Sequence, residues 1–461
     1  MIEKNKKQNP KSRGASKFSY QKSGNIRVIH KLKTPDNIKS VNQKSVAYSS
    51  TQKTAPQKTT RSSYQYGNKR NNHRSKITDK SETNTTKSII NKSRKSNIPN
   101  AEKDTIRIIP LGGVEEIGKN MTAIEIGDDI IVIDAGMQFK TKETPGIDYI
   151  IPNTTYLEER KDKIRGIFIT HAHLDHIGGL PLVMNRIGNP PLYSRNLTIL
   201  MIKKRQEEFP HLPALKINVV EKNSVVKAGN LTVRFFGVTH TVPDSMGVIV
   251  ETPYGIIVNP GDYKLDQVDG QVAEQEEKEY AFFEKEKVLL LMADSTNIEN
   301  EGFALPEIKV HQGLEKLIKG ISGRIIIAAF ASHTTRLVKI VEIAESLGKK
   351  VAIDGRSIKT NMDVCELAGL FKPKKGTIIP IEEAENYPPN KVIVLMTGAQ
   401  GEEFSALDRA ANKTHKKFNI RKGDTIILSA SIVPGNEISV QHLKDNLTRH
   451  GVRIISYRTS E

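Results

Sequence analysis

Four residues with metal-binding side chains lie within six positions of one another: His171, His173, Asp175 and His176. They follow an apolar run over residues 166–169 that is typical of a buried strand. In an extended loop, side chains two positions apart point the same way, so the first three are predicted to converge on one point and the fourth on a neighbouring point. Imidazole and carboxylate groups are ligands of divalent metals such as zinc. The loop therefore predicts two metal ions in one cleft.

Further candidate ligands follow other predicted strands: Asp134 after residues 130–133, His240 after 231–237 and Asp262 after 255–259. A lone histidine is most often structural, and a carboxylate at a strand end often caps a turn. The recurrence of a strand followed by a ligand favours a metal site for His240 and Asp262. For Asp134 it favours an acid that orients a metal-bound histidine.

The basic excess of the chain is confined to its first hundred residues. Residues 1–100 hold 24 Lys and Arg against 4 Asp and Glu, out of 70 and 52 in all, so residues 101–461 hold 46 against 48. With few apolar residues and no periodicity, residues 1–104 are predicted to form a disordered basic extension. Its function has two readings, contact with RNA phosphates and simple solubilisation, and RNA contact is favoured.

Cysteine usage and hydropathy indicate a cytoplasmic protein. Cys365 is the only cysteine, so no disulfide can form within the chain, which fits a reducing compartment. No apolar run approaches the ~20 residues of a membrane helix, and the first residues have no signal-peptide pattern. We therefore expect no membrane partner.

From about residue 305 the chain alternates helices with strands of the parallel type. Strands are predicted over 324–330, 350–353, 391–397 and 425–430, and a charged helix is expected earlier, over about 271–287. The pattern predicts an α/β domain over 305–461 after a first domain over 105–304. Small and polar residues follow these strands, where parallel sheets bind ligands, and helix N-termini there suit phosphate. Each loop taken alone also fits an ordinary turn.

These motifs resemble known families. The His-Ala-His-Leu-Asp-His loop (171–176), with Asp134, His240 and Asp262, resembles the metallo-β-lactamase superfamily. Further stretches resemble the ribonuclease J family of bacterial beta-CASP nucleases: residues 112–120, 294–297, 330–333, 398–402, 429–431 and 434–437. The resemblance runs from about residue 105 to the end of the chain, and the basic extension lies outside it.

The resemblance implies a metallo-β-lactamase αββα sandwich with an inserted beta-CASP α/β domain. It also implies two zinc ions, with Mn²⁺ or Mg²⁺ as alternatives. One ion would be held by His171, His173 and His240. The other would be held by Asp175 and His176, with Asp262 bridging the two. Asp134 would not bind an ion itself but would support a ligand by a hydrogen bond. The catalytic residues would be Asp175, Asp262 and Asp294.

The family hydrolyses RNA both endonucleolytically and from 5′ to 3′ as an exonuclease, in rRNA processing and mRNA decay. We therefore expect a zinc-dependent ribonuclease acting on single-stranded RNA, with a 5′ monophosphate preferred. Association with ribosomes or a degradosome, and a homodimer or tetramer of the full-length protein, are further expectations. The candidate RNA contacts at the strand ends are Ser332, His333, Arg336, Gly398, Gln400 and Ser431.

The carboxyl end departs from the family pattern. In the family a His-x-Ser-Gly-His loop and a later Pro-Val-His-Gly loop follow the last matched strand, and the chain reaches Glu461 before either. Those loops would supply a ligand of the second metal, the general acid and part of the 5′-phosphate pocket. We therefore expect a truncated chain with an incomplete sandwich that is weak or inactive alone. Ala399 is a smaller departure, because the family more often has serine there.

Three other functions fit parts of the sequence. One is a lactamase-fold hydrolase of a small ester or thioester, and the long second α/β domain and the basic extension argue against it. Another is a DNA-directed beta-CASP nuclease, which the ribonuclease J-type stretches disfavour. The third is a noncatalytic RNA-binding scaffold, which would have lost metal ligands that are present in this part of the chain.

Overall fold

The computed structural model describes residues 98–99, 101–102, 104–139, 144–299, 301–433 and 435–456, together with the backbone of residues 26–28. All of these belong to one compact unit. The predicted disorder of residues 1–104 concerns positions that lie mostly outside the described residues. Within that range, strand β1 (Ile26–Val28) pairs in parallel with β2 (Ile106–Gly112), which the sequence does not predict.

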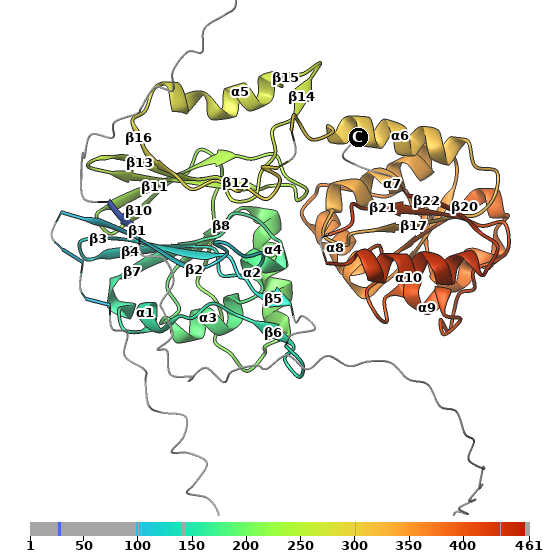
Figure 1. Ribbon diagram of the computed structural model, residues 1–461, viewed down its shortest axis with the longest axis horizontal. Helices are drawn as coiled ribbons and strands as arrows, with labels where there is room; N and C mark the ends of the chain where they lie inside the picture. Colours follow the sequence, from blue (N-terminus) through green and yellow to red (C-terminus); the bar gives the residue numbers. More distant parts are fainter. Residues whose placement is uncertain are drawn as a thin grey trace, which may run out of the picture. The chain divides into compact units, whose positions relative to one another are not determined.

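The first half of the described chain folds into two facing sheets (Figure 1). The larger has the strand order β1-β2-β3-β4-β7-β8-β9, antiparallel from β2 to β4 and parallel from β4 to β9. The smaller has the order β10-β11-β12-β13-β16. The bounds are β3 (Met121–Ile126), β4 (Asp129–Ile133), β7 (Ile164–Phe168), β8 (Leu192–Ser194), β9 (Ile217–Val219), β10 (Val225–Ala228), β11 (Leu231–Gly237), β12 (Met246–Thr252), β13 (Gly255–Asn259) and β16 (Val288–Leu291).

This half of the chain has four layers: helices, the larger sheet, the smaller sheet and a second helical layer. Ile131 and Phe168 of the larger sheet pack against Phe235 and Val248 of the smaller one. The next residue along β11, Phe236, points the opposite way, because successive strand side chains alternate between faces. It packs against the segment formed by α5 (Glu274–Tyr280) and the 3₁₀ turn η2 (Ala281–Glu284). The outer face of the larger sheet is covered by α1 (Thr155–Glu158), α3 (Leu180–Arg186) and α4 (Asn196–Glu207). The predicted αββα arrangement is confirmed.

The second half is built on a six-stranded sheet in which every pair is parallel, with the order β19-β18-β20-β17-β21-β22. Ile325 and Ile327 face one side of it, and Ile326 and Ala328 face the other. The strand bounds are β17 (Ile325–Ala329), β18 (Lys350–Asp354), β19 (Ile378–Ile379), β20 (Val392–Met396), β21 (Thr425–Ser429) and β22 (Arg453–Ser456). The predicted parallel α/β architecture is confirmed.

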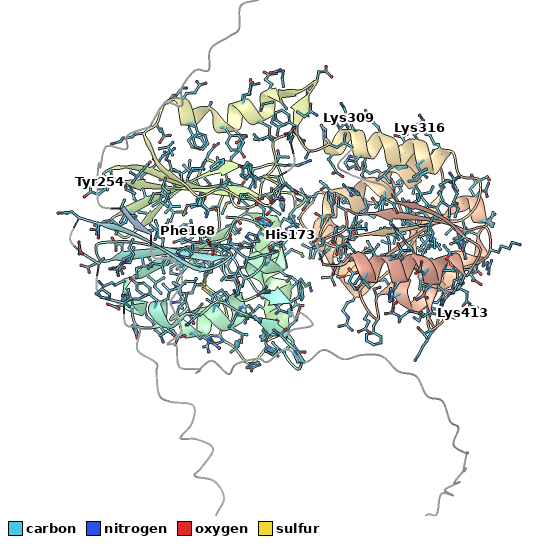
Figure 2. All side chains as sticks on the ribbon, viewed as in Figure 1. Phe168, His173, Tyr254, Lys309, Lys316 and Lys413 are labelled. Carbon is cyan, nitrogen blue, oxygen red and sulfur yellow. The ribbon has the colours of Figure 1, made fainter. Side chains whose placement is uncertain are left out.

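Helices cover both faces of this sheet. One face carries α6 (Glu307–Lys319), α7 (Thr334–Ser346) and α8 (Arg356–Leu367). The other carries η3 (Ile381–Asn386), α9 (Ala406–Ala411) and α10 (Glu437–Thr448). In α6, Val310, Leu314 and Ile318 recur at every fourth position and are buried, whereas Lys309 and Lys316 lie on the exposed side (Figure 2). Among the described residues, no helix combines the length and apolarity that crossing a membrane requires.

One predicted helix is shorter than expected. The charged helix predicted over 271–287 begins only at Glu274, because β14 (Gln267–Val268) and β15 (Gln271–Val272) form a hairpin before it. Asp269 and Gly270 form the two-residue turn, both with positive φ (50° and 81°), as the tightest hairpins require. The smaller elements are β5 (Gln138–Phe139), β6 (Tyr149–Ile150), η1 (Lys161–Lys163), α2 (Leu174–Ile177) and η4 (Pro389–Lys391).

Candidate metal centre

The histidine-rich loop leaves the carboxyl end of β7 and turns into the short helix α2. His173 is the residue before that helix and still has an extended backbone (φ −70°, ψ 147°). The alternation that would aim Asp175 with His171 and His173 therefore stops at His173. Asp175 and His176 lie on a helical turn, and the structure groups Asp175 with His176 and Asp262. The prediction that Asp175 converges with His171 and His173 is therefore wrong, because Asp175 belongs to the second ligand group.

One group of four potential ligands consists of His171, His173, His240 and Asp262, whose donor atoms all lie within 4.8 Å of one another. His173 Nδ1 is 3.0 Å from His171 Nε2 and 3.2 Å from His240 Nε2. A tetrahedral zinc site with Zn–N bonds of about 2.0–2.1 Å has ligand-to-ligand distances of about 3.3 Å. The observed spacing and donor types therefore fit a divalent ion such as zinc.

A second group shares one carboxylate with the first. It consists of Asp175, His176 and Asp262. His176 Nε2 lies 3.4 Å from Asp175 Oδ2 and 3.3 Å from Asp262 Oδ1. The other oxygen of that carboxylate, Asp262 Oδ2, is 3.9 Å from His171 Nε2 in the first group. Asp262 is thus placed to offer one oxygen to each of two ions.

The protonation states of the cluster suit a cation. Burial lowers the pKa of His173 to about 4 and that of His240 to about 3, and burial together with the neighbouring imidazoles holds the pKa of His171 well below its usual value. Burial opposes ionisation of Asp175, but His176 beside it lowers the carboxyl pKa to about 2. At neutral pH the first group therefore presents unprotonated imidazoles, and Asp175 is ionised, as metal ligands must be.

His176 differs from the other three histidines. Burial disfavours its protonated form, but the carboxylates of Asp134 and Asp175 outweigh burial and raise its pKa well above the usual value. Asp134 Oδ2 lies 2.8 Å from His176 Nδ1, so the opposite nitrogen, Nε2, faces the cluster. Asp134 also accepts a hydrogen bond from the backbone N–H of Thr170 at 2.8 Å. Its geometry thus fits both predicted roles: Asp134 caps the turn through Thr170, and it orients His176.

Two supporting residues were not singled out by sequence reasoning. Asn120 Nδ2 donates to Asp175 Oδ2 at 3.1 Å, and Asn120 N donates to the carbonyl oxygen of Asp175 at 2.8 Å. Thr170 Oγ1 lies 3.1 Å from His171 Nδ1 and 2.9 Å from Asp134 Oδ2. The loops meet this closely because Gly136 has no side chain, since a Cβ there would lie 1.5 Å from the carbonyl oxygen of Asp175. Only Thr170 had a local signal, its place directly before His171.

Asp294 belongs to neither ligand group among the described residues. Its Oδ1 accepts hydrogen bonds from Thr296 N at 2.8 Å and Thr296 Oγ1 at 2.6 Å. This is an Asx-type turn after β16, in which the side chain closes its own loop. The structure therefore gives Asp294 a loop-closing role, and its predicted catalytic role stays a proposal.

The loops of the parallel sheet that were predicted to bind RNA meet where β17 lies between β20 and β21. Arg336 is buried, donates to both oxygens of Glu307 at 2.9 Å, and donates to the carbonyl oxygen of Ser429 at 3.1 Å. Gln400 is also buried and joins two loops, donating to Ser431 O at 2.7 Å and accepting from Val433 N at 2.8 Å. Arg336 and Gln400 therefore support these loops, and their predicted RNA contacts stay predictions.

The other predicted contacts at this edge differ in exposure. Gly398 is buried with φ +116°, and a Cβ there would lie 2.3 Å from Ser405 Oγ, so the backbone of this loop requires glycine. His333 is 8% exposed, and its Nε2 lies 3.6 Å from Glu307 Oε2. Ser332 is half-buried and Ser431 is exposed. Of the six predicted contacts, these two serines lie nearest to solvent.

Comparison with known proteins agrees with this architecture. Residues 115–290 match the metallo-beta-lactamase superfamily, and residues 322–447 match the family described as "Ribonuclease J, beta-CASP domain". The chain is also 37% identical over 351 residues to proteins named Ribonuclease J 2 from Staphylococcus aureus (strain NCTC 8325 / PS 47) and Staphylococcus epidermidis (strain ATCC 12228 / FDA PCI 1200). The chain belongs to the ribonuclease J family.

The two matched ranges fall inside the ranges predicted for the lactamase-type and beta-CASP domains. The similarity covers 76% of this chain and 63% of each staphylococcal Ribonuclease J 2, so the chain spans less than two thirds of their length. A crystal structure of a protein of unknown function from Enterococcus faecalis V583 is similar with a TM-score of 0.55 and 17% sequence identity, over 76% of this chain and 87% of that one. That likeness concerns the fold alone.

Proposed function

We propose that this member of the ribonuclease J family is a metal-dependent ribonuclease that hydrolyses RNA phosphodiester bonds. The observation that carries the proposal is the pair of ligand groups that share Asp262. In a two-ion site, bound divalent ions lower the pKa of a water and stabilise the charge that develops on a transferring phosphoryl group. A shared carboxylate keeps two such ions close together.

The residues would divide this work as follows. His171, His173 and His240 would hold one ion, Asp175 and His176 the other, and Asp262 both. Three imidazoles and a carboxylate favour zinc in the first group. Mn²⁺ is the principal alternative, whereas Mg²⁺ prefers oxygen ligands. Asp134 holds Nδ1 of His176, and Asn120 Nδ2 lies 3.1 Å from both Asp175 Oδ2 and His176 Nε2, so these two side chains are oriented by neighbours outside the ligand groups.

The substrate range follows from charge and family. We propose single-stranded RNA with a 5′ monophosphate as the preferred substrate, cleaved endonucleolytically and from 5′ to 3′, in rRNA processing and mRNA decay. The proposed RNA contacts are the basic residues 1–100 and the strand-end loops with Ser332, His333, Arg336, Gly398, Gln400 and Ser431. A cytoplasmic location, a homodimer or tetramer, and association with ribosomes or a degradosome belong to the same proposal, as does a domain division near residue 305.

The test is cleavage of labelled single-stranded RNA, single-stranded DNA and a generic thioester by the purified chain, with and without a chelator. We expect RNA cleavage that is lost on chelation, restored by zinc or manganese, and reduced more than ~100-fold in His173→Ala. His211→Ala is the matched control, because His211 is exposed and belongs to neither ligand group. Thioester hydrolysis without RNA cleavage would favour the small-molecule hydrolase instead.

Metal content, measured in parallel, separates weak turnover from a missing site. Two bound ions per chain with slow RNA cleavage would show an intact metal site with weak turnover. RNA binding with no bound metal would favour the noncatalytic scaffold.

A further inference from the structure

The loop that carries His240 is held by a residue of the beta-CASP half of the chain. Thr335, in the first turn of α7, donates its hydroxyl to the carbonyl oxygen of Thr241 at 2.9 Å. These two residues are 94 positions apart in sequence. Thr241 directly follows the proposed ligand His240, so the start of α7 is tied to a ligand loop by a side-chain hydrogen bond.

The side chain of the same Thr241 reaches a second ligand. Thr241 Oγ1 lies 3.3 Å from Nε2 of His173. The other ring nitrogen, Nδ1, is the one that lies 3.0 Å from His171 Nε2 and 3.2 Å from His240 Nε2. A hydrogen bond at one ring nitrogen decides which nitrogen of an imidazole is free to bind a metal, and it also fixes the orientation of the ring. Thr241 is therefore placed to keep Nδ1 of His173 available to the ion.

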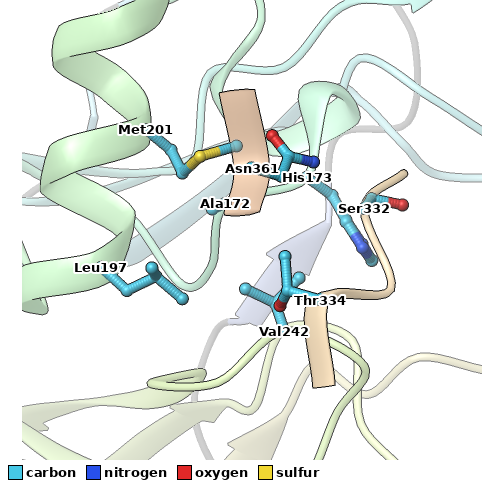
Figure 3. A pocket seen from close by; sticks show the side chains of 8 residues that line it. All are labelled: Ala172, His173, Leu197, Met201, Val242, Ser332, Thr334 and Asn361. Atoms are coloured by element: carbon cyan, nitrogen blue, oxygen red, sulfur yellow. The ribbon is translucent and has the colours of Figure 1, made fainter. Parts of the chain in front are cut away.

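The two halves of the chain pack closely around His173. His173 and Val242 of the lactamase-type half and Ser332 and Thr334 of the beta-CASP half together line a cavity of about 10 Å³, in which Val242 lies beside Thr334 and His173 beside Ser332 (Figure 3). A water needs roughly 10–15 Å³, so the cavity has room for one at most. A shift of the first turn of α7 therefore displaces the neighbours of His173 directly.

The first turn of α7 is itself firmly held. Arg336, the residue after Thr335, forms a two-point ion pair with Glu307 and donates to the end of β21. Asn361 Nδ2 of α8 donates to the carbonyl oxygen of Ala331, in the loop before α7, at 2.6 Å. Thr335 is thus part of a rigid segment, as a residue must be if it is to position another.

We propose that Thr335, acting through Thr241, is a positioning residue for the metal ligand His173, so that the beta-CASP half of the chain sets the metal affinity of the first ligand group. The inference rests on the proposed metal site and deepens it. It makes the beta-CASP half a determinant of the metal centre, in addition to its proposed contacts with RNA.

The experiment compares Thr241→Val and Thr335→Val with the unmodified chain. Cobalt and zinc affinities are measured by competition with a chromophoric chelator, and the cobalt absorption spectrum reports ligand geometry. Loss of a hydrogen-bonded outer partner of a metal ligand lowers affinity by about 10–100-fold, which is the loss expected for Thr241→Val in one of two binding steps. Thr335 is separated from His173 by one more hydrogen bond than Thr241 is. Thr335→Val is therefore expected to lower the affinity of the same metal-binding step by about three- to tenfold.

Conservative variants and a matched control separate positioning from general damage. Thr241→Ser and Thr335→Ser keep the hydroxyl and are expected to restore the affinity and the cobalt spectrum. Thr448→Val removes a hydroxyl that likewise donates to a backbone carbonyl, that of Asp445 at 2.8 Å in α10, and is expected to leave both unchanged. Because Thr335 acts through Thr241, adding Thr335→Val to Thr241→Val is expected to cause little further loss.

The outcomes distinguish this inference from the proposed function. Two ions bound by the unmodified chain, with unchanged affinity in Thr335→Val, would overturn the link to the beta-CASP half while leaving the metal site in place. Loss of affinity in both the valine and the serine variants would assign the effect to packing and overturn the hydrogen-bond argument. Failure of the unmodified chain to bind cobalt or zinc would overturn the proposed function and this inference with it.

Discussion

His176 Nδ1 lies 2.8 Å from Oδ2 of Asp134, and this buried pair fixes which nitrogen of His176 faces the ligand groups. Asp134 comes directly after β4 and has φ +60°, a conformation that few residues other than glycine adopt and that aspartate tolerates. Hydrogen bonds from Thr170 hold the carboxylate in this position. The pair links two loops that are 42 positions apart in sequence.

Replacing Asp134 with Asn is expected to weaken metal binding at the group that contains His176. The amide keeps the shape of the side chain but removes the negative charge beside the ring, so the affinity for one of the two ions should fall by about 10–100-fold. Chelator competition measures this loss. Asp128→Asn is the control, because Asp128 is an exposed carboxylate whose partner is Lys163. Equal affinities in Asp134→Asn and the unmodified chain would contradict an orienting role.

Asp262→Ala is expected to weaken the binding of both ions, since its two oxygens face different ligand groups. Asp175→Ala should weaken only one, because Asp175 belongs to the second group alone. Direct ligands should matter more than outer partners, so each affected step should weaken by more than ~100-fold. Metal content after dialysis, measured by elemental analysis, gives the number of ions retained. Retention of one tightly held ion in Asp262→Ala would rule out the bridging position.

The sequence predicts elements well where one face or both faces of a strand are buried in a regular pattern. Apolar runs that end in a polar residue locate β4, β7, β11 and β13, and the members of both ligand groups follow β7, β11 and β13. Local pattern fails where a short element intervenes. Strand alternation predicts that Asp175 points the same way as His171 and His173, but α2 begins between His173 and Asp175. The helix predicted from residue 271 begins at Glu274, because β14 and β15 form a hairpin before it.

Contacts between distant parts of the chain leave no signal in one sequence. Nothing about Thr335 or Thr241 marks them as partners, because a threonine near a helix start is ordinary. The RNA contacts predicted at Arg336 and Gln400 stay predictions, and the structure adds hydrogen bonds between loops that one sequence does not reveal. A polar residue after a parallel strand can face a ligand or join neighbouring loops, and only burial distinguishes the two.

Deleting residues 1–100 is expected to reduce the salt dependence of RNA affinity. This segment holds 24 Lys and Arg against 4 Asp and Glu. For single strands, each neutralised phosphate contributes about −0.7 to the slope of log affinity against log salt concentration. Fluorescence anisotropy with labelled single-stranded RNA at several salt concentrations measures the slope. An unchanged slope in the deletion variant would leave solubilisation as the role of the segment.

Glu307→Gln is expected to destabilise the beta-CASP half by about 3 kcal/mol, because it leaves the buried guanidinium of Arg336 without a counter-charge. Urea unfolding of the metal-free chain at pH 7 measures this loss. Glu315→Gln is the matched control in the same helix, since Glu315 pairs with Lys319 on the exposed side of α6. A Glu307→Gln variant as stable as the control variant would show that Arg336 finds another partner.

The same ion pair predicts how stability depends on pH. Burial opposes ionisation of Glu307, but the neighbouring side chains of His311, His333 and Arg336 hold the pKa of this carboxyl far below its usual value. A carboxyl whose pKa is lower in the folded state stabilises the fold above its unfolded pKa, and this contribution is lost as the pH falls below it. The stability difference between the unmodified chain and Glu307→Gln should therefore be constant from about pH 6 to 8 and shrink by about 1.4 kcal/mol per pH unit below about 4.5. Urea unfolding at pH 7 and pH 3.5, with Glu315→Gln beside it, tests this, and a difference that grows on acidification would contradict the assigned pair.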